Sequence, residues 1–331
     1  MRMPIALALV AGAALVRPLG PAPVHAATPR DSMLMSVAEL APLVERHDPT
    51  LVVLQVGAAR AYAAGHIPGA RRADMDQFIA PMDMMHAEVM KTEIMTELPT
   101  DAALLATLES FGITDRSHIV VAETENSHST ATRIYLTLVH AGLGPNTRLL
   151  DGGLKAWVAE GHATSTAAPP ATRSTLASLK TVPVTVDAAA VRAHEHTPGT
   201  VILDVRSPAA WAGTEAATDD STTPARYGHI PSAVSLPLEK LWDNATSRLR
   251  PAAELERIFA DAGVKPTDEI IAYCYVGQRA TATIFAAETL GHRAWLYDGS
   301  MDEWTKLKLP LEMPGGKRSG GISPGSLEAG R

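Results

Sequence analysis

The chain has 331 residues, enough for two ordinary domains, and 46% of them are hydrophobic while 20% are charged. This composition supports a sizeable core, and the net charge of −7 argues against nucleic acid as a partner. No apolar run in the mature part of the chain is long enough to span a bilayer, so no membrane partner is expected after the N-terminal segment is removed.

The N-terminal segment has the pattern of a signal peptide. A basic start at Arg2 is followed by an apolar stretch from Pro4 to Val16, and the segment ends in Val24-His25-Ala26. Short residues at these positions suit signal peptidase, which predicts cleavage after Ala26, a signal peptide over residues 1–26 and export to the periplasm. An uncleaved anchor or a loose apolar tail is the alternative.

An internal repeat organises the rest of the chain. Five blocks recur in one order: 51–56 with 201–206, 65–70 with 228–233, 111–122 with 262–273, 130–132 with 281–283, and 149–157 with 296–304. Each half alternates short apolar strands with helical stretches, such as 102–111 and 254–262. This alternation predicts two α/β domains, each with a parallel sheet whose ligand site lies beyond the carboxyl ends of its strands.

The repeat also divides the chain. We expect a first domain over residues 32–161, a linker rich in Ala, Thr, Ser and Pro over 162–183, a second domain over 184–312 and a flexible tail over 313–331. The second half carries an insertion over 213–227, expected to be a surface loop near the site. A monomer is expected, because the repeat already fills the role of a dimer.

The only cysteine opens the segment that carries most of the chemistry. Between a predicted strand over 270–273 and a predicted helix over 280–290, the loop reads Cys274, Tyr275, Val276, Gly277, Gln278, Arg279. Gly277 allows the loop N–H groups to converge, and the helix start and Arg279 add positive charge. A thiol in such a cradle is expected to be a thiolate, although a lone Cys274 can also be a small buried hydrophobe. Being unpaired, it cannot form a disulfide within the chain.

These residues resemble the tandem-domain rhodaneses, which are thiosulfate and 3-mercaptopyruvate sulfurtransferases. The resemblance rests on the repeat, two Gly-His-Ile-Pro blocks, the Asp-Gly-Gly and Asp-Gly-Ser blocks before a Trp, and the Cys-x-x-Gly-x-Arg loop, over residues 32 to 312. It implies two rhodanese-like domains, each a central parallel sheet flanked by helices, with one active site at their interface. Alignment of the matched Thr-Ala-Thr triplets makes Glu123 the residue of the first domain that is equivalent to Cys274. Because a carboxylate cannot carry a persulfide, the first domain is predicted to be inactive.

The resemblance implies a two-step sulfur transfer. The Cys274 thiolate takes the outer sulfur of thiosulfate, releases sulfite, and passes the sulfur to a thiophile such as cyanide or a thiol. Arg279 and the N–H groups of the loop, from Tyr275 to Gln278, would bind the sulfonate-like oxygens. The resemblance places Asp204 and Arg206 near the mouth of the site, and the alternative for them is a structural ion pair. No metal or organic cofactor is implied.

The choice of sulfur donor and three rival functions remain open. Enzymes that use 3-mercaptopyruvate usually have a small, neutral loop, so the bulkier cationic loop favours thiosulfate. A Cys-based phosphatase has five residues between its Cys and Arg, whereas four separate Cys274 from Arg279. The methionine-rich segment 75–95 has soft ligands for copper(I), although such methionines more often pack around a cleft. A carrier that loads sulfur but turns over poorly differs from the enzyme only in rate.

Overall fold

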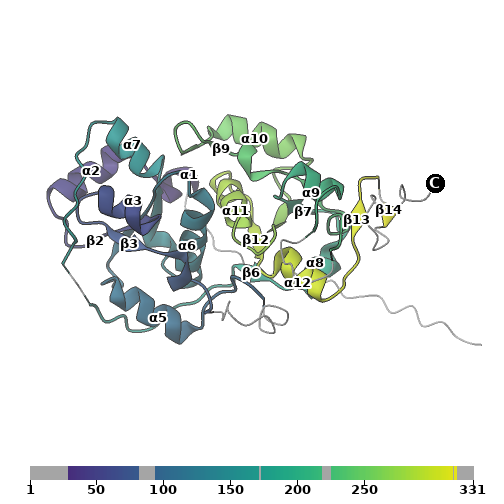
Figure 1. The fold of residues 1–331 in the computed structure, drawn as a ribbon, viewed down its shortest axis with the longest axis horizontal. Helices are drawn as coiled ribbons and strands as arrows, with labels where there is room; N and C mark the ends of the chain where they lie inside the picture. The colour runs from purple at the N-terminus through teal and green to yellow at the C-terminus, as the bar shows by residue number, and fades with distance from the viewer. Residues whose placement is uncertain (1–28, 82–93, 171–172, 218–224, 316, 319–331) are drawn as a thin grey trace, which may run out of the picture.

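The structure, a computed structural model, describes residues 29–81, 94–170, 173–217, 225–315 and 317–318. They form two α/β units that lie side by side, with helices α6 (His128–His140) and α11 (Ala280–Thr289) facing each other between the two sheets (Figure 1). The predicted signal peptide, most of the methionine-rich segment and most of the C-terminal tail lie outside the described residues.

The first unit is built on a sheet of parallel strands in the order β1-β5-β4-β2-β3. Its strands are rich in Val, Leu and Ile and are buried on both faces because helices cover the sheet. The elements are α1 (Pro29–Met33), β1 (Leu34–Met35), α2 (Val37–Glu45), β2 (Leu51–Val56), α3 (Ala59–Ala64), β3 (Arg71–Ala73), η1 (Met75–Gln77), α5 (Asp101–Ser110), β4 (His118–Glu123), α6, η2 (Gly144–Asn146), β5 (Thr147–Leu150) and α7 (Gly153–Ala159).

The second unit repeats this order, with a parallel sheet β6-β12-β11-β7-β8. Two short antiparallel pairs, β9 with β10 and β13 with β14, are added to it. The elements are β6 (Thr185–Val186), α8 (Ala188–His194), β7 (Thr200–Asp204), α9 (Pro208–Ala212), β8 (Val234–Ser235), η3 (Leu238–Lys240), β9 (Trp242–Asp243), β10 (Arg248–Leu249), α10 (Ala252–Asp261), β11 (Glu269–Tyr273), α11, β12 (Ala294–Tyr297), α12 (Ser300–Lys306), β13 (Glu312–Met313) and β14 (Lys317–Arg318). The prediction of two parallel-sheet α/β units is confirmed.

Strand register shows that the two sheets are equivalent residue by residue. Gln55 of β2 pairs with Ala122 of β4, and Asp204 of β7 pairs with Tyr273 of β11. The next position along each central strand is Glu123 in the first unit and Cys274 in the second. The register therefore gives the same correspondence as the sequence repeat, with the only cysteine at the carboxyl end of its sheet.

The two units share one hydrophobic core. The largest cluster of buried side chains includes residues of both sheets and of both helices at the interface. Tyr135 of α6 packs edge-on against Phe285 of α11 with ring centroids 4.9 Å apart, and Thr132 hydrogen-bonds Thr281 at 2.8 Å. Because such an interface is apolar and continuous with both cores, it holds the two units in a fixed arrangement.

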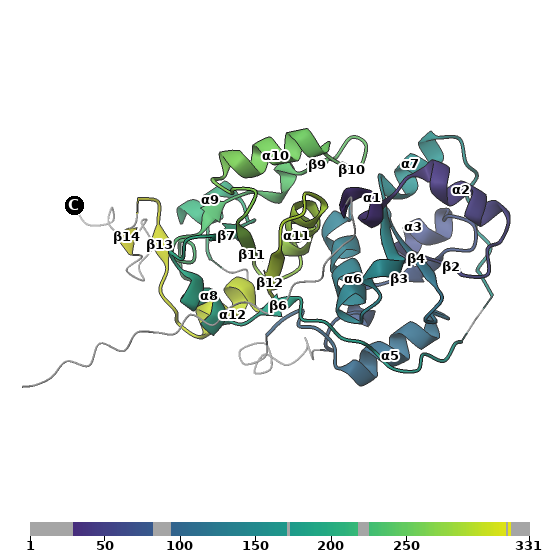
Figure 2. The same ribbon diagram turned by 180° about the vertical axis from the view of Figure 1, so that it is seen from behind.

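The segment between the units runs along the first unit rather than away from it (Figure 2). Its Ser174 N–H donates to the carbonyl of Glu109, and its Val182 N–H donates to that of His140. Leu176 is buried against the core. In the described part of 162–183 there is no helix or strand. No described helix is both long and apolar enough to cross a membrane.

Candidate functional site

Cys274 lies at the carboxyl end of β11 with 1% of its surface exposed. Its peptide N–H donates to Ser300 Oγ at 3.1 Å, and Ser300 Oγ donates in turn to the carbonyl of Tyr297 at 2.8 Å. The Cys274 carbonyl accepts from the N–H of Met301 at 3.2 Å. The start of α12 therefore holds the backbone of the cysteine on both sides of its side chain.

The loop after Cys274 depends on Gly277. This residue has φ +81°, and a Cβ atom built on it would lie 2.4 Å from the carbonyl oxygen of Asp298. Only glycine fits both constraints. Among the described residues, no partner accepts a hydrogen bond from the N–H groups of 276–279. These groups are therefore free of internal acceptors among the described residues, and an anion in the loop could accept from them.

Arg279, which the sequence predicts to bind the substrate anion, has a carboxylate partner in the structure. It directly precedes α11, and its Nη2 forms an ion pair with Glu239 of η3, with 38% of the arginine side chain exposed. Its Nε has no hydrogen-bond partner among the described residues. Because an ion pair this exposed contributes at most about 1 kcal/mol, an incoming anion can compete with Glu239 for the guanidinium.

Asp204 and Arg206 form a wholly buried ion pair. Arg206 donates to Asp204 through Nε and Nη2, to the carbonyl of Ala217 at 2.9 Å and to that of Gly228 at 2.9 Å. Burial alone lowers the pKa of Arg206, but Asp204 outweighs it and raises that pKa above its usual value. These contacts fit the structural alternative, because they use donors that a substrate would need.

The buried pair reaches the loop after Cys274 through aromatic rings. The guanidinium carbon of Arg206 lies 5.4 Å from the centroid of Tyr275 and 5.8 Å from that of Tyr273. The Tyr273 hydroxyl donates to Asp204 at 2.7 Å. The Asp204–Arg206 pair thus packs against Tyr275, the second residue of the loop.

A segment of the first unit contacts the loop after Cys274. We call residues 95–98 the first strap. Thr96 Oγ1 donates to the carbonyl of Val276, and the Leu98 N–H donates to Asp298 at 3.2 Å. From α6, Thr130 Oγ1 accepts from Gln278 Nε2 at 2.9 Å. The site of the second unit is therefore completed by the first, which places it at the interface.

Arg133 ties the first strap to the loop. This α6 side chain is fully buried and donates to both carboxylate oxygens of Asp298 and to the carbonyl of Thr96. Asp298 in turn lies against Gly277. One guanidinium thus holds two neighbours of the Cys274 loop, Thr96 and Asp298, at once.

The first strap also brings an acidic group to the site. Burial, and then the neighbouring Asp298 and Glu303 carboxylates, raise the pKa of Glu97 to about 7. Its charge therefore changes near neutral pH, beside a loop suited to anions.

The equivalent loop of the first unit is filled by its own side chains. Glu123 is buried, and its Oε2 lies 2.7 Å from His128 Nδ1, close enough for an ion pair but without the alignment of a hydrogen bond. The His128 ring stacks on Trp242 of the second unit at 4.4 Å. Burial raises the pKa of Glu123 although His128 opposes the shift. No nucleophile occupies this position.

Sequence reasoning missed four residues of the site: Ser300, Thr96, Glu97 and Arg133. Only Ser300 carried a local signal, because it replaces Gly153 of the first unit in the matched Asp-Gly block. Its φ of +49° is close to the +55° of that glycine. In the described part of the chain, no group of three His, Cys, Asp or Glu side chains is placed to hold a metal ion.

The sequence matches the model of the rhodanese-like domain twice, over residues 36–160 and 187–307. The chain belongs to the rhodanese family. This confirms the family that the sequence resembled.

Relatives in the rhodanese family have both kinds of name that the sequence suggested. The chain is 27% identical to "Thiosulfate sulfurtransferase" of Pseudomonas aeruginosa, covering 82% of this chain and 93% of the relative. It is 31% identical to "Probable 3-mercaptopyruvate sulfurtransferase" of the same organism, covering 74% of this chain and 83% of the relative. The rhodanese is therefore a sulfurtransferase by family, which implies a small-molecule sulfur donor and acceptor.

Solved structures with the same fold include the anaerobic ergothioneine biosynthesis enzyme from Chlorobium limicola. It is 23% identical, with a TM-score of 0.74, covering 86% of this chain and 71% of that one. The wild-type structure of EanB gives 22% identity and a TM-score of 0.73, covering 86% of this chain and 70% of that one. At such identities the likeness establishes the fold of this rhodanese.

Proposed function

We propose that the protein is a thiosulfate sulfurtransferase that works through a persulfide on Cys274. The Cys274 thiolate attacks the outer sulfur of thiosulfate, the S–S bond breaks, and sulfite leaves with the electron pair. Cyanide or a thiolate then attacks the outer sulfur of the persulfide, and the Cys274 thiolate is restored. Both steps conserve charge, and neither needs an oxidant or a metal.

The observation that carries the proposal is the loop itself. Cys274 precedes a turn whose N–H groups, from Val276 to Arg279, have no partner among the described residues and flank the start of α11. Such groups stabilise the negative charge of thiosulfate and of the departing sulfite. Arg279 lies at the same turn, and its ion pair with Glu239 is exposed enough for the ligand to replace Glu239.

The test is thiocyanate production from thiosulfate and cyanide by the chain without residues 1–26, beside Cys274→Ser. We expect activity that the variant abolishes, and sulfite release in the absence of cyanide equal to one per active site. Activity with 3-mercaptopyruvate alone would overturn the choice of donor. If Cys274→Ser retained activity, the persulfide itself would be wrong.

We also propose that the enzyme is exported and acts as a monomer. The support for export is the pattern of residues 1–26. Edman sequencing of the protein from a periplasmic extract is expected to start at Ala27, and a start at Met1 would contradict it. Light scattering of the same sample is expected to give the mass of one chain.

A further inference from the structure

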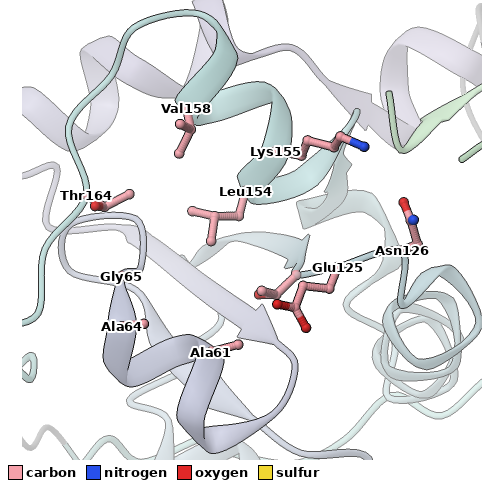
Figure 3. Close-up of a pocket in the computed structure, with 10 residues that line it drawn as sticks. Ala61, Ala64, Gly65, Glu125, Asn126, Leu154, Lys155, Val158 and Thr164 are labelled. Carbon is pink, nitrogen blue, oxygen red and sulfur yellow. The ribbon is translucent and has the colours of Figure 1, made fainter. Parts of the chain in front are cut away.

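A cavity of about 580 Å³ opens at the carboxyl edge of the first sheet, beside the loop that has lost its nucleophile (Figure 3). Ala61 and Ala64 of α3 form one side, and Leu154 and Val158 of α7 form another. Thr124 and Glu125 of the loop complete it. This volume suits a small molecule, and in parallel α/β sheets ligands bind at this edge.

Beside the cavity, the first unit has smaller side chains than the second unit has at the equivalent positions. The register that pairs Gln55 with Ala122 and Asp204 with Tyr273 makes these pairs equivalent. Two residues further along, Gly57 and Thr124 replace Arg206 and Tyr275. One arginine and two tyrosines of the second unit thus become Gly57, Ala122 and Thr124.

Gly57 and Thr124 lie next to each other beside the cavity. A Cβ atom on Gly57 would lie 2.8 Å from Thr124 Cβ, so the two residues are in contact, and Thr124 lines the cavity. In the second unit the same region holds the buried Arg206, which packs beside Tyr273 and Tyr275. The first unit therefore has no guanidinium here, and Thr124 lies between Gly57 and the cavity.

Two charged residues line the cavity, Glu125 and Lys155. Gln55 replaces Asp204 and is neutral, and its amide is occupied by Thr124 Oγ1 and the Ile67 N–H. Glu125 forms no ion pair within the described parts of the chain. Lys155 extends away from the hollow in Figure 3, and its Nζ donates to the carbonyl of Asn244 at 3.2 Å. Glu125 thus remains as a carboxylate that a cation can neutralise.

The lining also has an exposed apolar surface. Val158 is 53% exposed although it is a large hydrophobic residue, and Leu154 lies one helical turn before it on α7. Covering these side chains removes apolar surface from water, which favours a ligand with a short hydrocarbon tail.

We propose that this cavity binds a small organic cation, a guanidinium or primary ammonium group with a short apolar tail. The head group pairs with Glu125 near the place that corresponds to the guanidinium of Arg206. The tail lies against Leu154 and Val158. Anions such as thiosulfate are disfavoured by Glu125, so this site is separate from that of the sulfur donor.

The test is calorimetric titration of the whole chain with four probes of equal length: n-butylguanidinium, n-butylammonium, n-butanol and n-butyrate. We expect the two cations to bind and the alcohol and the anion not to bind. Glu125→Gln is expected to weaken the cations about five- to tenfold, whereas Asp115→Asn, an exposed carboxylate of the same unit, leaves binding unchanged.

A second variant tests the place of binding. Ala61→Phe puts a ring into the hollow and is expected to abolish binding while thiocyanate production through Cys274 is unchanged. Three results overturn the proposal: no probe binds, butanol binds as well as the cations, or Glu125→Gln binds the cations as tightly as the wild type. Because the readout is binding, none of them depends on the sulfur donor.

Discussion

The loops after β4 and β11 occupy equivalent places in the two sheets but have opposite contents. After β11 the turn presents backbone N–H groups, and Arg206 fills the space beside it. After β4 the turn is plugged by Glu123 and His128, and the space beside it is open. The backbone of the fold therefore does not decide whether an end of the sheet is reactive. The side chains that fill the loop and its surroundings do.

The largest expected effect comes from removing the turn that distinguishes the two loops. Gly277→Ala adds a Cβ atom 2.4 Å from the carbonyl of Asp298 at φ +81°. We expect thiocyanate production to fall about a hundredfold, because the loop must shift away from the cysteine. The matched control is Gly263→Ala, which has the same φ and nothing within 4 Å of the new atom.

Gly263→Ala is expected to lower the free energy of unfolding by about 1 kcal/mol and to leave kcat unchanged. Equal losses of activity in the two glycine variants would show that the loss comes from an alanine at positive φ and not from the contact with Asp298.

Ser300→Gly converts the start of α12 to the residue that the first unit has at Gly153. The change relieves a serine at φ +49° but removes the acceptor of the Cys274 N–H. We expect kcat to fall about tenfold, because the lost hydrogen bond positions the backbone of Cys274. Little change is expected in KM or in the free energy of unfolding. Ser232→Gly, at φ +64°, is the control and is expected to retain full activity.

Helix α11 carries a buried carboxyl group that α6 lacks. Burial raises the pKa of Glu288 on α11 to about 8, whereas the equivalent residue on α6 is the neutral Thr137. Between its usual pKa of 4.5 and 8 the folded protein holds a proton that the unfolded chain releases, so stability falls as pH rises. Between pH 5 and pH 8, the free energy of unfolding of Glu288→Gln is expected to rise by about 1–3 kcal/mol relative to that of the wild type, as measured by urea unfolding.

If the free energy of unfolding depended on pH in the same way for the wild type and Glu288→Gln, the pKa of the Glu288 carboxyl group would not be raised by folding.

The smallest expected effect concerns the strap over the active loop. The pKa of Glu97 is raised to about 7, so this group gains a negative charge as pH passes through neutrality. The KM for thiosulfate, a dianion, is expected to rise about two- to threefold from pH 6 to 8. Glu97→Gln should remove this rise. A variant whose KM follows the wild-type profile would place the titrating group elsewhere.

Local patterns were sufficient to predict the frame of the site. The strand predicted over 270–273 is Glu269–Tyr273, and the helix predicted over 280–290 is Ala280–Thr289. Both follow from apolar periodicity and from a glycine that ends the helix. The repeat then gave the equivalence of Glu123 and Cys274, which the strand register repeats.

Contacts between distant segments could not be predicted in this way. Arg133 and Asp298 are 165 residues apart, and Thr96 and Val276 are 180 apart. No local pattern records such a meeting, because the shape of the whole interface sets it. The same holds for Arg279, whose partner Glu239 lies on a different element.

The first strap, which belongs to the first unit and contacts the second, has a counterpart in residues 247–249, which belong to the second unit and contact the first. Leu249 N–H donates to Asp151 at 3.2 Å, as Leu98 N–H donates to Asp298, and Ser247 Oγ reaches Asn126 as Thr96 reaches Val276. During synthesis the first unit therefore cannot complete its loop until residues 247–249 have left the ribosome. A break in the linker would leave two halves that regain their hydrogen bonds only by reassociating. Fragment complementation, rather than truncation, is the way to express either half in its native state.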